Sequence, residues 1–167
     1  HYLRAREYLH MRTKTSVQLA RRLFVRAVEL DPLYARAYAG MADCDSYLSS
    51  WLGVPIPVDD ILATTGKALA IDPNLPEAHA VRAHALVNAG RRAEAVSFFE
   101  QALALDPNCH EANYYYGRFF YTEGDLDRAA KHYIRALEIQ PNDYKSPMLL
   151  YGVYQALGRH DEAQKYA

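Results

Sequence analysis

The stretch Ala102-Leu103-Ala104-Leu105-Asp106-Pro107 decides the fold, because similar stretches recur at one fixed interval before it and after it. The earlier copy runs from Ala68 to Pro73, and the later copy runs from Ala136 to Pro141. A chain that repeats one unit at a fixed distance stacks that unit into a solenoid. Solenoids display an extended concave surface, which makes binding the first function to consider.

Each unit carries the signals of two helices. Glycine recurs near the middle of three units, at Gly90, Gly124 and Gly158. These glycines divide the unit into two helices, and the repeated proline ends the second helix. In the third unit, the small residues Ala83, Ala95 and Ala102 allow the helices to approach closely, and Phe99 and Leu103 fill the space beside them.

This pattern resembles the tetratricopeptide repeat, a helix-turn-helix unit of about 34 residues, and the resemblance covers essentially the whole chain. It implies an all-α, right-handed superhelical solenoid of antiparallel helix pairs with about four and a half units. We expect units at about 1–34, 35–75, 76–109, 110–143 and, truncated, 144–167. The expected helices lie near 2–13, 16–29, 35–49, 58–70, 76–89, 92–105, 110–123, 126–139 and 144–157, with a last one from 160.

The second unit is longer than the others, because the interval from Pro32 to Pro73 exceeds the interval from Pro73 to Pro107. The extra residues fall at about 50–57, in an apolar segment that contains Trp51, Leu52 and Ile56. Such a segment either folds back on the neighbouring helices or forms a docking surface.

Length and composition fit a single globular domain. Half of the 167 residues are apolar, which excludes disorder, and no apolar run is long enough to span a membrane. The chain shows no secretory signal. It begins at His1 without methionine and stops within an expected helix, so we expect it to be part of a longer polypeptide. The isolated Cys44 and Cys109 argue against a disulfide framework and favour a cytoplasmic location.

Charge is distributed unevenly along the chain. Residues 1–26 carry seven basic residues and one acidic residue, whereas residues 27–167 carry 12 basic and 19 acidic residues. In a solenoid this places positive charge at one end. That end either faces a neighbouring domain, or pairs head to tail in a homo-oligomer, or binds nucleic acid. We do not expect nucleic acid as a partner, because the basic residues lack interleaved aromatic residues.

The resemblance also implies which side chains line the concave groove, because the first helix of each tetratricopeptide unit forms that face. The implied set is Arg36, Asp43, Tyr47, Glu77, His84, Asn88, Glu111, Tyr114, Arg118, Tyr121 and Lys145. A helix places Tyr114, Arg118 and Tyr121 on one stripe. Tyrosine and arginine are enriched at binding hot spots. The alternative role of this stripe is packing between units.

Several specific functions find no support. Chaperone-binding members of the family hold Lys and Asn in the groove, but the corresponding positions here are Ala39, Gly40, Ala80 and Val81. The sequence has no phosphate-binding loop, no nucleophile elbow and no metal-binding helix motif. We therefore expect no catalytic residue, no metal and no cofactor.

The stretch from Ala27 to Asp43 (AVELDPLYARAYAGMAD) resembles the repeat region of some bacterial signalling proteins, including class III adenylate cyclases and winged-helix transcriptional regulators. We expect a module that binds a partner protein or peptide in its groove, as a regulatory segment of such a protein. The alternatives are a self-association or structural element that positions another domain, and a sensor whose groove closes on a small molecule.

Overall fold

The computed structural model describes residues 1–143 and 145–167. Over these ranges the chain forms α-helices and one short 3₁₀ turn, without a strand, so the expected all-α class is confirmed. The elements are α1 (Tyr2–His10), α2 (Lys14–Leu30), α3 (Ala35–Leu52), α4 (Val58–Ile71), α5 (Pro76–Asn88), α6 (Arg92–Leu105), α7 (His110–Thr122), α8 (Leu126–Ile139), α9 (Lys145–Ala156), α10 (His160–Ala163) and η1 (Gln164–Tyr166).

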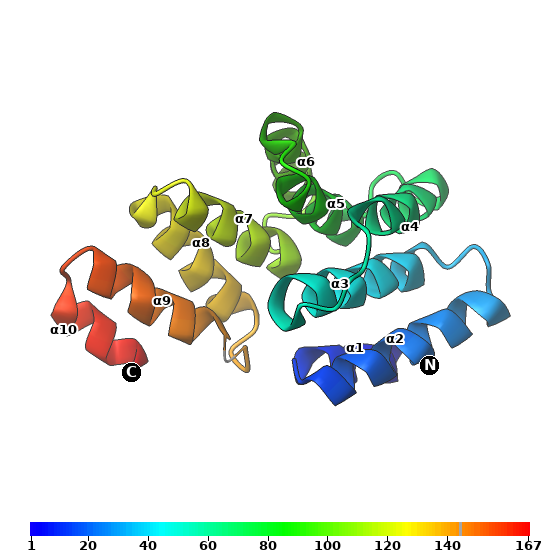
Figure 1. The fold of residues 1–167 in the computed structure, drawn as a ribbon, viewed down its shortest axis with the longest axis horizontal. Coiled ribbons are helices and arrows are strands. Elements are labelled where there is room, and N and C mark those ends of the chain that lie inside the picture. The colour runs from blue at the N-terminus through cyan, green and yellow to red at the C-terminus, as the bar shows by residue number, and fades with distance from the viewer. Residues whose placement is uncertain (144) are drawn as a thin grey trace.

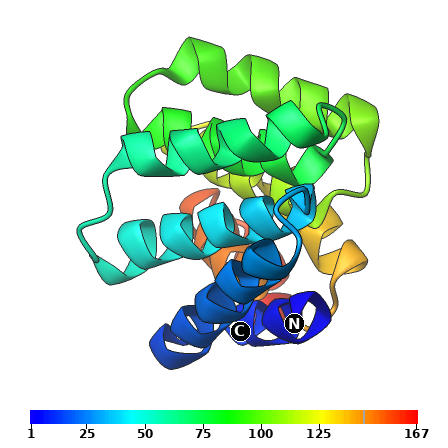
Figure 2. The same cartoon turned by 90° about the vertical axis from the view of Figure 1, so that its right-hand side faces the viewer.

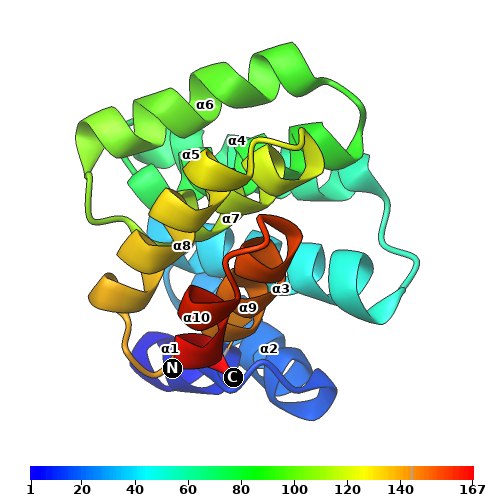
Figure 3. The same ribbon diagram turned by 90° about the vertical axis from the view of Figure 1, so that its left-hand side faces the viewer.

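The helices form two layers. The odd-numbered helices make the inner layer, in which α3 packs against α5 and α5 packs against α7. Helices α2, α4, α6 and α8 of the outer layer pack against the inner helices that precede and follow them. Figure 1 shows that the stack bends into an arc, with α1 and α2 at one end and α9 and α10 at the other. Figure 2 looks onto the first of these ends and Figure 3 onto the second.

Glycine and proline divide the chain where their repeat spacing predicts. Gly90, Gly124 and Gly158 follow inner helices and adopt φ values of 76°, 79° and 70°, a region that favours glycine. The outer helices α4, α6 and α8 end shortly before the repeated prolines. Glycine therefore separates the two helices of a pair, and proline separates one pair from the next.

The repeated bulky and small positions build the core. Phe99 and Tyr133, one repeat length apart, are fully buried between the layers, and Phe24 takes the equivalent place in the first pair of helices. Gly117 lies against Tyr133 so closely that a β-carbon there would sit 2.9 Å from its ring. The small residues of the pattern therefore set how closely inner and outer helices approach.

The helix expected over 35–49 extends further in the structure. Helix α3 continues to Leu52 and ends at Gly53, whose φ of 63° closes the helix while the amide of Val54 donates to the carbonyl of Leu48 at 3.0 Å. The predicted end of this helix at residue 49 was wrong, because the prediction did not recognise Gly53 as a C-terminal cap. The extra turn carries Trp51 onto the inner face.

Candidate functional site

The residues that we expected in the groove all lie on inner helices, but their exposure differs widely. Five are buried, namely Asp43, Tyr47, His84, Tyr114 and Lys145. Glu77, Glu111 and Arg118 are partly buried, and Arg36, Asn88 and Tyr121 are exposed. The middle of the concave face is therefore filled by side chains of the chain itself, and only its margins are open.

The stripe of Tyr114, Arg118 and Tyr121 is not a continuous exposed surface. Tyr114 is 3% exposed and stacks on His110, whereas Tyr121 is 43% exposed. Phe119 and Phe120 precede Tyr121 in the last turn of α7 and are only 8% and 5% exposed, so the difference depends on which face of the helix a residue occupies. For Tyr114, packing between repeats describes the structure better than groove exposure.

A buried ion pair lies at the centre of the concave face. Arg12 Nη2 lies 3.7 Å from Asp43 Oδ2, and the hydroxyl of Tyr115 donates to Asp43. The hydroxyl of Tyr47 donates to the carbonyl of Arg12 at 2.5 Å. Burial lowers the pKa of Arg12, but Asp43 outweighs it and the pKa stands above its usual value. Three separate segments, α3, α7 and the turn after α1, meet at this pair.

Sequence reasoning missed Arg12 and Tyr115. Arg12 was counted only as one of seven basic residues near the N-terminus, and nothing in its neighbours marks it as buried. Its φ of 51° is a conformation rare for a side chain of this size, and it aims the guanidinium inward. Two further members of that basic group, Arg21 and Arg26, pair with Asp45 and Glu29. The positive end expected from the sequence is therefore partly neutralised.

Trp51 joins the second and fifth helix pairs. The ammonium of Lys145 lies 3.7 Å from the centre of the Trp51 ring, and the guanidinium of Arg118 lies 4.4 Å from it. Tyr47 stacks on the same ring at 6.4 Å. Of the segment expected as a docking loop, Trp51 and Ile56 pack against the core and Leu52 is 39% exposed. The folded-back alternative thus describes Trp51.

Contacts between distant parts of the sequence also tie α1 to the C-terminal half. The side-chain amide of Gln140 and Nδ1 of His10 lie 2.9 Å apart. Next to them, Nε2 of His110 lies 3.3 Å from Asp143, which also accepts the amide of Lys145 at the start of α9. These hydrogen bonds hold the pKa of Asp143 at about 2 against the opposing effect of burial. The arc is thereby held in a tight curve.

An open cavity lies at the N-terminal ends of α5 and α7, and we call it the N-side mouth. Its volume is about 580 Å³. Helices α1, α5 and α7, the last residue of α8 and the loops that follow α6 and α8 contribute its lining: Arg6, Glu7, His10, Glu77, Asp106, Asn108, Cys109, His110, Glu111, Ile139, Gln140 and Asn142. Two residues of the expected groove set, Glu77 and Glu111, therefore lie in this cavity.

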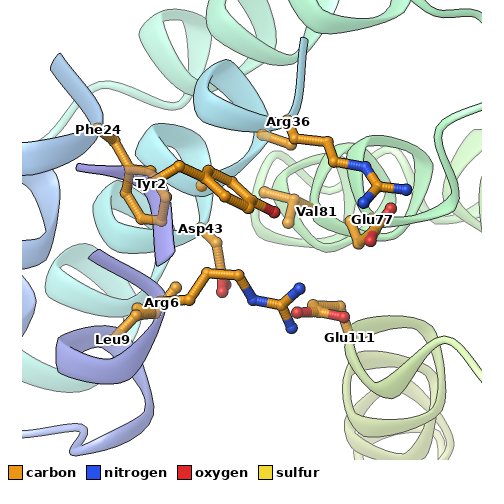
Figure 4. A pocket seen from close by; sticks show the side chains of 11 residues that line it. Tyr2, Arg6, Leu9, Phe24, Arg36, Asp43, Glu77, Val81 and Glu111 are labelled. Atoms are coloured by element: carbon orange, nitrogen blue, oxygen red, sulfur yellow. The ribbon is translucent and has the colours of Figure 1, made fainter. Parts of the chain in front are cut away.

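A second, narrower cavity continues inward from the mouth, and we call it the Tyr2 pocket. It shares Arg6, Glu77 and Glu111 with the mouth and adds Tyr2 and Arg36 near its rim. Its free volume of about 30 Å³ is large enough to hold a water molecule. Figure 4 shows the side chains of Arg6, Glu77 and Glu111 converging on this space.

The carboxylates of the mouth differ in their environments. Burial, together with the nearby charge of Glu111, raises the pKa of Glu77. Burial acts in the same direction on Glu111, but the neighbouring His110 and Arg6 lower its pKa below the usual value. Burial lowers the pKa of His10. Within the described residues, Oε2 of Glu77 is buried and accepts no hydrogen bond.

The described part of the chain holds no group of three or more His, Cys, Asp or Glu side chains that could bind a metal ion. None of its described helices combines the length and apolar character that crossing a bilayer requires. The lining of the mouth consists mainly of charged and other polar side chains.

Comparison with known proteins identifies the architecture. Residues 81–144 match the family model described as tetratricopeptide repeat. The structure of TTC0263, a thermophilic TPR protein of Thermus thermophilus, is similar with a TM-score of 0.68 and 22% identity, over 92% of this chain and 79% of that chain. PilW, a type IV pilus biogenesis factor, gives a TM-score of 0.65 and 24% identity, over 99% of this chain and 72% of that chain.

The structure of MamA is also similar, with a TM-score of 0.59 and 22% identity, over 93% of this chain and 86% of that chain. At such identities these likenesses establish the fold alone. In sequence, no curated protein matches the chain.

Proposed function

We propose that this chain, whose fold is that of the tetratricopeptide repeat proteins, is a protein-interaction module that binds a segment of a partner protein at its N-side mouth. The observation that carries the proposal is that side chains fill one part of the concave face and leave another part open. Its centre is filled by the chain's own buried side chains, whereas the mouth is open and has a volume of about 580 Å³. That space suits one or a few side chains of a docked segment.

The chemistry of the mouth favours a protein segment over a small apolar ligand. Small-molecule sites are mostly enclosed and lined by apolar side chains with few polar groups. The mouth is open and lined chiefly by charged and amide side chains such as Arg6, Glu77, Glu111 and Gln140. Polar, solvent-accessible lining of this kind is typical of the outer part of a protein interface.

The finer proposal is that the module regulates a larger bacterial signalling protein in the cytoplasm. Its support is the resemblance of residues 27–43 to the repeat regions of such proteins. The buried free thiols of Cys44 and Cys109 fit a reducing compartment. Sequencing the reading frame on both sides tests this proposal. A cyclase or winged-helix domain upstream would support it, and further repeats alone on both sides would contradict it.

Self-association is a second candidate, because Arg4, Lys14 and Arg22 remain exposed at the N-terminal end of the arc. Attraction between exposed charges is screened by salt. Light scattering should then show a dimer at low ionic strength that dissociates when salt is added. A monomer at low ionic strength would exclude association through this end.

Peptide selection tests the main proposal directly. Peptides selected from a displayed library on the purified protein should bind the N-side mouth. Reversal of both carboxylates in Glu77→Arg/Glu111→Arg should weaken their binding at least about tenfold, because the reversed charges face the docked segment. Circular dichroism shows whether the variant keeps its helices.

The matched control is Glu94→Arg/Glu138→Arg, which makes the same charge change on exposed positions of the outer helices α6 and α8. It should bind the selected peptides as the unchanged protein does. Equal binding by both double variants would remove the mouth as the binding site. A selection that yields no binding peptide would contradict the proposed function itself.

A further inference from the structure

The N-side mouth and the Tyr2 pocket carry more negative than positive charge. Their combined lining includes five carboxylates, from Glu7, Asp43, Glu77, Asp106 and Glu111, and two guanidinium groups, from Arg6 and Arg36. Arg12 compensates Asp43 from the buried side. The N-terminal ends of α5 and α7 add about half a positive charge each. A net negative charge remains after both corrections.

Two buried oxygen atoms in this space lack a hydrogen-bond donor within the described ranges. They are Oε2 of Glu77 and Oδ2 of Asp43, and the side chain of Asp43 is 4% exposed. The nearest cation of Asp43 Oδ2 is Arg12, at an ion-pair distance of 3.7 Å. A buried acceptor without a donor is unfavourable, so a ligand that brings N–H groups would be stabilised here.

The arginines of the lining do not supply those donors. Among the described residues, neither Arg6 nor Arg36 forms an ion pair with Glu77 or Glu111. Figure 4 shows the guanidinium of Arg6 facing Glu111, with the ring of Tyr2 above it and the hydroxyl of Tyr2 pointing toward Glu77. An aromatic ring next to carboxylates is an environment that favours a cation.

We propose that the mouth binds a lysine or arginine side chain of the partner segment, with its ammonium or guanidinium group in the open part of the mouth beside Glu77 and Glu111. This inference rests on the proposed function and adds the chemical class of the inserted side chain. The cation donates to Oε2 of Glu77 and offsets the excess of carboxylates. Arg6 competes for the same carboxylates from within the chain.

Blocked single amino acids test the inference without a partner. N-acetyl-lysine amide and N-acetyl-arginine amide each carry one cationic side chain, and N-acetyl-glutamine amide is the neutral control. Backbone amide shifts measured by NMR should move saturably at Glu77, Ala78, Glu111 and Ala112 with the two cationic compounds only. Glu77→Gln should weaken that binding about tenfold, because the docked cation loses a partly buried charge partner.

Two further variants make the outcome specific. Glu94→Gln removes an exposed carboxylate on α6 and should leave the shifts unchanged. Arg6→Gln removes the competing cation and should strengthen binding of the cationic compounds. Equal shifts with the neutral compound, or no localised shift with either cationic compound, would overturn the inference.

The two proposals can fail separately. If selected peptides bind the mouth but carry no basic residue, and the blocked lysine and arginine do not bind, the function stands and the cationic class is wrong. If no peptide depends on Glu77 and Glu111, while the blocked cations still bind there, the cation site stands without the proposed function.

Discussion

The two faces of the arc use charge in opposite ways. On the inner face, Arg12 and Asp43 form an ion pair whose side chains are 9% and 4% exposed. At the outer helix α6, Arg91 and Glu94 form a pair whose side chains are 48% and 53% exposed. A buried pair destabilises the protein strongly when one partner is lost, whereas an exposed pair contributes little. The comparison teaches that loss of one charge should cost more stability on the inner face than on the outer face.

The largest expected effect breaks the inner pair. Asp43→Asn keeps an acceptor for Tyr115 but removes the carboxylate from the buried guanidinium of Arg12. The free energy of unfolding should fall by about 3 kcal/mol, because a buried charge loses its counter-charge. Urea denaturation measures this change, and Glu94→Gln on the outer face should leave stability nearly unchanged. Similar losses in both variants would show that the two faces do not differ.

A smaller effect concerns the buried His84 of the inner face. Burial, with a contribution from Arg118, lowers the pKa of His84 to about 3, whereas the unfolded chain has the usual value. As the pH falls, His84 therefore becomes protonated in the unfolded chain at a higher pH than in the folded protein. Proton binding then favours the unfolded state, and stability falls as the pH drops below about 6.5. Between pH 7 and pH 5 the loss through His84 should be about 2 kcal/mol.

The His84→Gln variant checks the origin of this pH dependence. Its stability at neutral pH will differ because Ser50 and Asn88 contact His84. The quantity to compare is the change in unfolding free energy from pH 7 to pH 5, which should be smaller than in the unchanged protein. An identical change in both proteins would assign the dependence to other groups.

The smallest expected effect comes from comparing two glycines of the inner helices, one packed against an outer helix and one with open space beside it. Gly117 of α7 faces the outer helix α8, and a β-carbon there would meet the ring of Tyr133 at 2.9 Å. Gly117→Ala should destabilise the fold by roughly 1 kcal/mol or more through overpacking. At Gly152 of α9, none of the described residues outside its own turn of helix comes within 4 Å of an added β-carbon. Gly152→Ala should therefore be neutral or stabilise by up to about 1 kcal/mol. Thermal unfolding of the two variants gives the comparison, and equal melting temperatures would contradict it.

The fold was predictable because its signals are local. Proline and glycine act on their own backbone, and Phe99 and Tyr133 occupy the same place in successive units, so spacing alone identified the helix pairs. The largest errors of extent were at α1, which was expected to reach residue 13 but ends at His10, and at α3, whose glycine cap was read as part of the extra segment. That signal was present in the sequence as Gly53.

The site was only partly predictable, because exposure on the inner face depends on the curvature of the arc. From the repeat positions we predicted that Tyr47, Glu77 and Lys145 lie on inner helices, and the structure places them there. Whether such a residue is open or covered depends on which distant helix lies opposite. Lys145 of the fifth helix pair reaches Trp51 of the second, with two pairs between them in sequence, and no local pattern encodes that approach.

The hydrogen bond between His10 and Gln140 has a consequence for how the chain folds. In a simple solenoid each repeat touches only its neighbours, so folding can start at any repeat and spread along the array. Here the first and fourth helix pairs also meet, through side chains 130 residues apart in sequence. Contacts of such separation raise the contact order, and their loop-closure entropy slows folding. The contact between the first and fourth helix pairs should therefore form late in folding, after the repeats between them are ordered.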